Sequence, residues 1–216
     1  MCLPGFYAYD LDHMKSIVLP PTLKALLPLQ IHGLCSGAHY KKHERLFITG
    51  KSPEWMFYVV TGEVTLERTG LQGESVVLQR PRLGFVSEAS LKTAKYHCDA
   101  LAISETNVIK VPIKALAAAL DRDPDFASRW ISMLNTEVKR LRLHCERLSM
   151  KSVKDRVLHL IHTEGKNGQF PVNTGLKSLA GELGVTHEAL YRTLAALEKD
   201  QKIRREEGLL ALFQAT

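Results

Sequence analysis

The sequence has no long uninterrupted hydrophobic run. Its most apolar region, residues 17–34, is broken by three prolines and a lysine, and interruptions at that density exclude a membrane-spanning helix. Residues 1–11 also lack a basic segment followed by an apolar one, so we expect no secretory leader. We therefore expect a cytoplasmic protein with no membrane partner.

Cysteine is scarce and scattered, at positions Cys2, Cys35, Cys98 and Cys145. No two of them show the C-x2-C spacing of zinc sites and iron–sulfur clusters, so we expect free thiols and neither a metal site nor a cluster. His97, Cys98 and Cys2 are the candidate axial ligands for a haem. Isolated residues of these types arise by chance in a chain with nine histidines, and we expect no haem.

Motifs for catalysis are also missing. The sequence has no nucleophile motif, no spaced metal ligands and no glycine loop that would cradle a phosphate, so an enzyme is not expected. Charge is mildly one-sided, with 29 Lys and Arg against 23 Asp and Glu and a net charge of +6. This surplus favours a polyanionic partner, though only weakly.

The first half of the chain has the pattern of short strands separated by glycine turns. Strands are expected within residues 39–48, 56–60, 63–68, 74–79, 99–104 and 107–111, with turns at residues 49–50, 61–62, 69–70 and 72–73 and a further corner at residues 83–85. Strands at roughly ten-residue spacing predict a small antiparallel barrel or roll, and a sandwich is the alternative. Helices are expected before them, over residues 10–17 and 22–29, on either side of Pro20 and Pro21.

A short helix is expected over residues 113–120, and the longest periodic segment of the chain follows it. Six side chains are spaced alternately three and four residues apart, which is the a/d seam of a coiled coil: Ile131, Leu134, Val138, Leu141, Cys145 and Leu148. The seam predicts a parallel helix that pairs with a second copy of the chain; packing against the chain's own roll through Phe126 and Trp130 is the alternative. A Cys145 thiol pair across such a dimer is a candidate redox sensor, and a small apolar filler is the alternative.

Residues 174–198 predict two short helices joined by a tight turn. Gly184 can adopt the positive φ that such a turn needs, and Thr186 is a good N-cap for a second helix that starts at His187. Apolar residues recur at helical spacing in both helices, and the small Ala180 allows a close crossing. This arrangement is typical of a helix-turn-helix, with an ordinary helical hairpin as the alternative.

The flanking segments complete a winged helix. A helix is expected over residues 152–162, a short strand over 170–172 and a β-wing over 202–213. The predicted fold class is α+β, with an N-terminal antiparallel, jelly-roll-like β-roll effector domain, a long dimerisation helix and a C-terminal winged helix-turn-helix. The expected domain boundaries are 1–120, 121–150 and 151–216.

Over residues 20–213 the chain resembles the Crp/Fnr family of bacterial transcription regulators. The resemblance rests on residues 60–64 and 84–91, on the long helix and, most specifically, on residues 183–194. It implies a dimeric, sequence-specific DNA-binding regulator whose recognition helix, residues 187–198, reads the major groove of a palindromic operator. The implied partners are double-stranded DNA and a second copy of the chain, with RNA polymerase as a further candidate.

The expected DNA-binding residues are Thr186, His187, Glu188, Tyr191 and Arg192. The family's pattern of a small or hydroxyl residue, Glu, and Arg four residues later is matched here, and it implies a TGA-like core in each half-site. Glu188 and Arg192 share one helix face, where a carboxylate accepts from cytosine N4 and a guanidinium donates to guanine O6 and N7. A surface salt bridge between them is the alternative. At the positions of His187 and Tyr191, several relatives carry other residues, so the sequence does not predict the preference for the outer bases of the operator.

The signal is less defined by the sequence. Family members that bind cyclic nucleotides pair a Glu with an Arg about ten residues on, which binds the phosphate. Glu88 matches that Glu, but Tyr96 or His97 stands where the Arg belongs, and Lys92 or Lys95 would offer only a point charge. We place the effector pocket at Glu88, Tyr96 and His97 and expect no cyclic AMP or cyclic GMP. A regulatory module acting through a protein partner is the alternative function.

Overall fold

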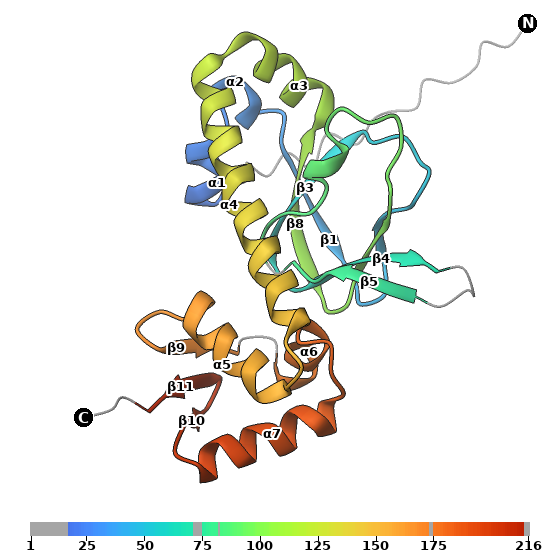
Figure 1. The fold of residues 1–216 in the computed structure, drawn as a ribbon. Coiled ribbons are helices and arrows are strands. Elements are labelled where there is room, and N and C mark those ends of the chain that lie inside the picture. The colour runs from blue at the N-terminus through green and yellow to red at the C-terminus, as the bar shows by residue number, and fades with distance from the viewer. Residues whose placement is uncertain (1–16, 71–74, 82, 173–174, 214–216) are drawn as a thin grey trace, which may run out of the picture.

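A computed structural model describes residues 17–70, 75–81, 83–172 and 175–213. It consists of an N-terminal β-roll, one long helix and a small C-terminal winged helix; in Figure 1 the long helix runs down one side of the roll, and the winged helix lies below both. The predicted α+β class with antiparallel sheets is confirmed. The turn predicted at residues 72–73 and nearly all of the helix predicted over residues 10–17 lie outside the described residues.

Two antiparallel four-stranded sheets form the roll. The first has the order β1-β8-β3-β6, formed by Ser36–Tyr40, Thr106–Pro112, Trp55–Thr61 and Gly84–Phe85. The second has the order β2-β7-β4-β5, formed by Arg45–Phe47, Asp99–Ala102, Val64–Thr69 and Ser75–Gln79. Alternating apolar side chains from both sheets meet in one buried cluster, which includes Phe57, Val64 and Ala100.

One glycine turn brings two ends of strands into close contact. Gly62, between β3 and β4, has a φ of 91°, and a Cβ there would lie 2.4 Å from the carbonyl oxygen of Glu105. Only glycine tolerates both the backbone conformation and this approach. The turn therefore fixes Glu63, the residue after it, beside the β7–β8 connection.

The helix predicted over residues 22–29 was wrong in its extent. The structure has two helices there, α1 (Pro21–Leu26) and α2 (Leu29–His32). Leu27 has a ψ of 141°, because the residue before a proline is pushed out of the helical region by the Cδ of Pro28. Leu23, Leu27 and Ile31 are buried and pack into the core cluster that contains Trp130.

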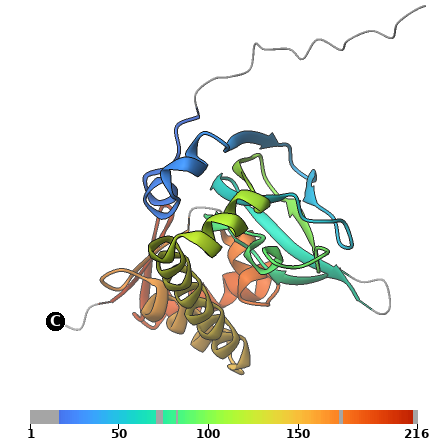
Figure 2. The same ribbon diagram turned by 90° about the horizontal axis from the view of Figure 1, so that it is seen from above.

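The long helix has a defined beginning and end. α3 (Ile113–Arg122) precedes it, and α4 spans Pro124–Ser149. Asp123 caps α4 by accepting a hydrogen bond of 2.9 Å from the Phe126 backbone N–H, and proline suits the first helical position. Phe126 and Trp130 are buried against the roll, and in Figure 2, where α4 is viewed nearly end-on, the strands of the roll lie to one side of it.

The C-terminal unit is a winged helix. It comprises α5 (Val153–Glu164), β9 (Gln169–Pro171), α6 (Gly175–Glu182), α7 (His187–Lys199), β10 (Ile203–Glu206) and β11 (Leu209–Leu212). The three strands form an antiparallel sheet of order β10-β11-β9. The fully buried Arg147, in the last turn of α4, forms an ion pair with Glu164 at the end of α5 and so connects the two helices. In the described part of the chain, no helix has the length and apolar character needed to cross a membrane.

Candidate functional site

The turn between α6 and α7 has the expected geometry. Gly184 has a φ of 65°, and the hydroxyl of Thr186 accepts a hydrogen bond of 3.2 Å from the Ala189 backbone N–H at the start of α7. The predicted N-cap and helix start are therefore confirmed. Six side chains of the two helices are buried in the core of the winged helix, namely Leu179, Ala180, Leu183, Leu190, Leu194 and Leu197.

The opposite face of α7 is open to solvent. Glu188, Tyr191 and Arg192 are exposed, and His187 is half-buried. Hydrogen bonds, first from its own backbone N–H and then from Thr186, lower the pKa of Glu188, with a smaller contribution from the charges of His187 and Arg192. Glu188 is therefore a carboxylate, an acceptor, at neutral pH.

His187 and Tyr191 form a unit of their own. Their ring centroids are 4.6 Å apart and the planes are inclined by 71°, an edge-to-face contact. The contact follows from their i, i+4 spacing on the helix. It orients both rings on the exposed face that also presents Glu188 and Arg192, so the structure brings the five predicted DNA-binding residues together on one surface.

A contact between α7 and the wing, formed by Glu198 and Arg205, was not predicted from the sequence. Glu198 accepts a hydrogen bond of 3.1 Å from the Arg205 backbone N–H and forms an ion pair with the Arg205 side chain. The Arg205 side chain lowers the pKa of Glu198. Because the two residues are seven apart across a turn, no local periodicity signals the contact. It sets the position of the wing relative to α7.

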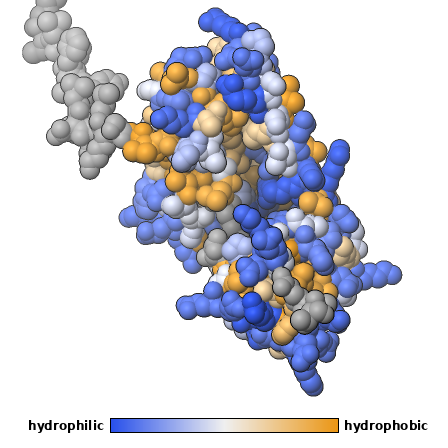
Figure 3. Space-filling model, turned by 90° about the vertical axis from the view of Figure 1, so that its left-hand side faces the viewer, coloured by the Kyte–Doolittle hydropathy of each residue, from blue (hydrophilic) through white to orange (hydrophobic). Residues whose placement is uncertain are grey.

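Most of the predicted seam on α4 is uncovered in the single chain. Ile131, Val138 and Leu148 are 56%, 44% and 39% exposed, and Cys145 is also exposed. Leu134 and Leu141 are half-buried. Figure 3 shows that hydrophobic surface also gathers over the upper half of one face of the molecule, among hydrophilic side chains.

A cavity of about 360 Å³, here called the effector cavity, lies between the roll and α4. It is lined by Thr22, Leu26, Tyr58, Pro81, Leu83, Gly84, Phe85, Glu88, Met133, Thr136, Glu137 and Arg140. Glu88 faces this space with its Oε2 buried and without a hydrogen-bond partner. Burial raises the pKa of its carboxyl from 4.5 to about 7.

The expected grouping of Glu88 with Tyr96 and His97 was wrong. Tyr96 is buried in the other core of the roll, stacked on Phe47 with ring centroids 4.1 Å apart. Its hydroxyl donates a hydrogen bond of 2.9 Å to the Trp55 carbonyl. His97 is exposed. Tyr96 and His97 lie in the irregular segment between η2 (Glu88–Ser90) and β7, where no periodicity fixes which cavity a side chain faces.

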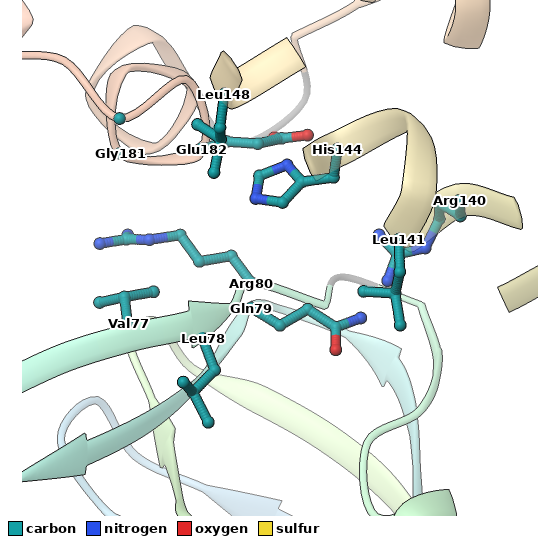
Figure 4. A pocket seen from close by; sticks show the side chains of 11 residues that line it. Val77, Leu78, Gln79, Arg80, Arg140, Leu141, His144, Leu148, Gly181 and Glu182 are labelled. Carbon is teal, nitrogen blue, oxygen red and sulfur yellow. The ribbon is translucent and has the colours of Figure 1, made fainter. Parts of the chain in front are cut away.

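A second cavity, of about 250 Å³, lies between β5, α4 and α6 (Figure 4). Arg80 extends across it from the roll towards Gly181 of α6, opposite His144 of α4. A Cβ at Gly181 would lie 2.9 Å from the Arg80 Cζ. The absence of a side chain at Gly181 therefore lets the guanidinium pack directly against α6.

The three thiols in the described part of the chain, Cys35, Cys98 and Cys145, do not form a cluster. Cys98 is buried in the roll, and burial raises its thiol pKa, like that of Cys35, to about 11. Both are therefore neutral thiols at physiological pH. Within the described ranges no three His, Cys, Asp or Glu side chains are close enough together to hold a metal ion. The haem candidate Cys2 lies outside them.

Comparisons with known proteins agree with this architecture. Residues 38–123 match the family described as the cyclic nucleotide-binding domain. The chain is 23% identical over 179 residues to the cyclic AMP receptor protein of Thermus thermophilus, covering 82% of this chain and 83% of that one. It is 22% identical over 201 residues to the global nitrogen regulator of Synechococcus elongatus, covering 87% of each.

Solved structures share the fold. FixK2 from Bradyrhizobium japonicum matches with a TM-score of 0.65 and 21% identity, over 83% of this chain and 93% of that one. A CooA mutant from Carboxydothermus hydrogenoformans matches with a TM-score of 0.63 and 16% identity, over 83% and 84% of the two chains. The fold is that of a winged helix preceded by an antiparallel β-roll. Over most of its length the chain is therefore similar to transcription regulators of the Crp/Fnr type, and its residues 38–123 match the cyclic nucleotide-binding domain.

Proposed function

We propose that the chain is a dimeric regulator in which α7 reads the major groove of a palindromic operator and the effector cavity takes the controlling signal. The observation that carries the proposal is the exposed pair Glu188 and Arg192, four residues apart on α7. A capped helix with one face fully buried presents the other face in a fixed orientation. The N-terminal side chains of such a helix are those that contact base edges.

The chemistry of the exposed face suits base reading. Glu188 accepts from the amino group of cytosine, and Arg192 donates twice to guanine. The edge-to-face rings of His187 and Tyr191 present apolar surface to a thymine methyl group. The exposed Lys202 and Arg204 of the wing are placed to contact phosphates, which position the protein without reading sequence.

The proposed dimer follows from the seam on α4. A stripe with Ile131, Val138 and Leu148 substantially exposed is buried when two copies of the helix pair in parallel. The two-fold axis of such a pair relates two α7 helices, and this symmetry is what a palindromic operator matches.

The test is selection of bound duplexes from a random library, with wild type and single variants. We expect wild type to select a palindrome with TGA-like half-sites. Glu188→Ala and Arg192→Ala should each lose about 1–3 kcal/mol of discrimination at the contacted base pair. Binding should also weaken steeply with salt, because phosphate contacts release counterions.

Two controls change charge on the same domain away from the N-terminal end of α7, where the base contacts are proposed. Lys199→Ala, at the end of α7, and Glu207→Ala, in the wing turn, should alter overall affinity without changing the selected sequence. The base-reading assignment is wrong if the Glu188 and Arg192 variants select the same sequence as wild type.

A further inference from the structure

We propose that the effector cavity binds an apolar molecule that carries a hydrogen-bond donor, an amine or a hydroxyl group, directed at Glu88. The proposal names the class of signal for the regulator described above, and it rests on that function for the consequence of binding. It makes a phosphorylated nucleotide the wrong class of ligand for this chain.

The size and walls of the cavity suit a small apolar body. Its volume of about 360 Å³ lies at the lower end of the range for small-molecule sites, which is roughly 300–1,000 Å³. Leu26, Phe85 and Met133 contribute apolar surface from α1, β6 and α4. Phe85 is fixed by an edge-to-face contact with Tyr58 and a tilted ring contact with Trp130, each with ring centroids 5.2 Å apart, so this wall is preformed.

Glu88 is the polar group of the cavity that needs a ligand. Its Oε2 is buried without a hydrogen-bond partner, whereas the hydroxyls of Thr22 and Tyr58 share a hydrogen bond of 2.8 Å. A buried acceptor without a donor is unfavourable, and native structures satisfy nearly all such atoms. A donor on the ligand would satisfy it.

The charges on the described lining disfavour an anion. The guanidinium of Arg140 donates through Nε to both carboxylate oxygens of Glu137, at 3.1 and 3.2 Å. Glu137 also accepts a hydrogen bond of 2.9 Å from the side-chain amide of Gln79. Arg140 is therefore neutralised by its neighbour, and Glu88 adds a second carboxyl group. Among the described lining residues no cation is left over for a phosphate.

The position of the cavity connects its occupant to the dimer helix. Met133, Thr136 and Arg140 line it from α4, and the seam residues Leu134, Val138 and Leu141 lie on the same turns of that helix. A ligand bridging the roll and α4 therefore biases the position of the proposed dimer helix.

Two fluorescent probes with the same anilinonaphthalene body test the proposal. N-phenyl-1-naphthylamine is neutral and has an N–H donor; 8-anilinonaphthalene-1-sulfonate adds an anion. With the full chain near pH 8, we expect saturable binding of the neutral probe at least about tenfold tighter than that of the sulfonate, because the sulfonate would face carboxylates. Glu88→Gln should reduce this preference to less than about threefold.

A second variant keeps the test decisive if Glu88→Gln folds poorly. Thr136→Trp fills the cavity from α4 and should abolish binding of the neutral probe. Glu105→Gln, an exposed acid in the β7–β8 turn outside the cavity, should behave as wild type. Absence of saturable binding, equal binding of both probes by wild type, or displacement of the neutral probe by micromolar cyclic AMP would overturn the proposal. Operator selection with the same preparations shows separately whether the regulator function stands.

Discussion

Glu88 illustrates how one buried carboxyl links stability to pH. Its pKa is raised from 4.5 to about 7, mainly because burial disfavours the charged form. Between these two values the folded protein binds the proton more tightly than the unfolded chain does. The contribution of this group to the free energy of unfolding therefore falls as the pH rises through that window and is constant above it.

Glu88→Gln removes this ionisation, which gives a prediction at the residue scale. We expect the variant to gain stability relative to wild type as the pH rises from about 5 to about 7.5, by on the order of 3 kcal/mol at 1.36 kcal/mol per pKa unit. Urea denaturation across this range measures the difference. Parallel stability profiles for the two proteins would show that the carboxyl ionises as it does in water.

At the scale of elements, α4 has two apolar faces that differ in burial. Phe126 and Trp130 are buried against the roll, while Ile131 and Val138 are exposed on the same helix. The apolar side chains of the first face are buried within one chain, and those of the second face are not. A helix with an exposed apolar stripe of heptad spacing is stabilised by burial of that stripe against a partner.

Leu141→Glu tests the seam. A carboxylate at a paired d position would be buried without a partner, at a cost of about 3 kcal/mol, so the dimer dissociation constant should rise by about 100-fold or more. Analytical ultracentrifugation measures it. Lys139→Glu, which places the same side chain on the outward face of α4, should leave the dimer intact. If both variants stay dimeric, the chains associate through another surface.

At the scale of the whole molecule, the winged helix is joined to the roll by a buried polar contact. The hydroxyl of Ser178, on α6, donates a hydrogen bond to the carboxylate of Glu63, after the Gly62 turn. Both residues are less than 10% exposed. Arg80 packs against α6 nearby, at Gly181. These contacts couple the position of the helix-turn-helix to the roll.

Ser178→Ala should loosen this junction. The variant removes a donor from the buried Glu63 carboxylate, at a cost of about 1–3 kcal/mol. Hydrogen exchange should become faster in α6 and in the β3–β4 turn. Ser149→Ala, which removes an exposed hydroxyl bonded to the Cys145 carbonyl, is the matched control. Unchanged exchange in α6 would mean that other contacts hold the two units together.

The sequence by itself determined the elements whose signals are local. Thr186 caps α7 as predicted, and the glycine turns separate the strands of the roll. Apolar residues three and four positions apart predict α4 and α7. Caps, turns and helix faces all depend on residues a few positions apart. Where a local rule was overlooked, at Pro28, the helix boundary was misplaced.

Only the tertiary structure decided which side chains meet across long separations. It showed that Glu88 and Arg140 line the same cavity, and that Tyr96 is buried in the other core of the roll. It also brought Ser178 to Glu63 and Glu198 to Arg205. Such contacts depend on how sheets and helices pack, which a short sequence period does not encode. The helix-turn-helix was therefore predictable from the sequence, and the lining of the effector cavity was not.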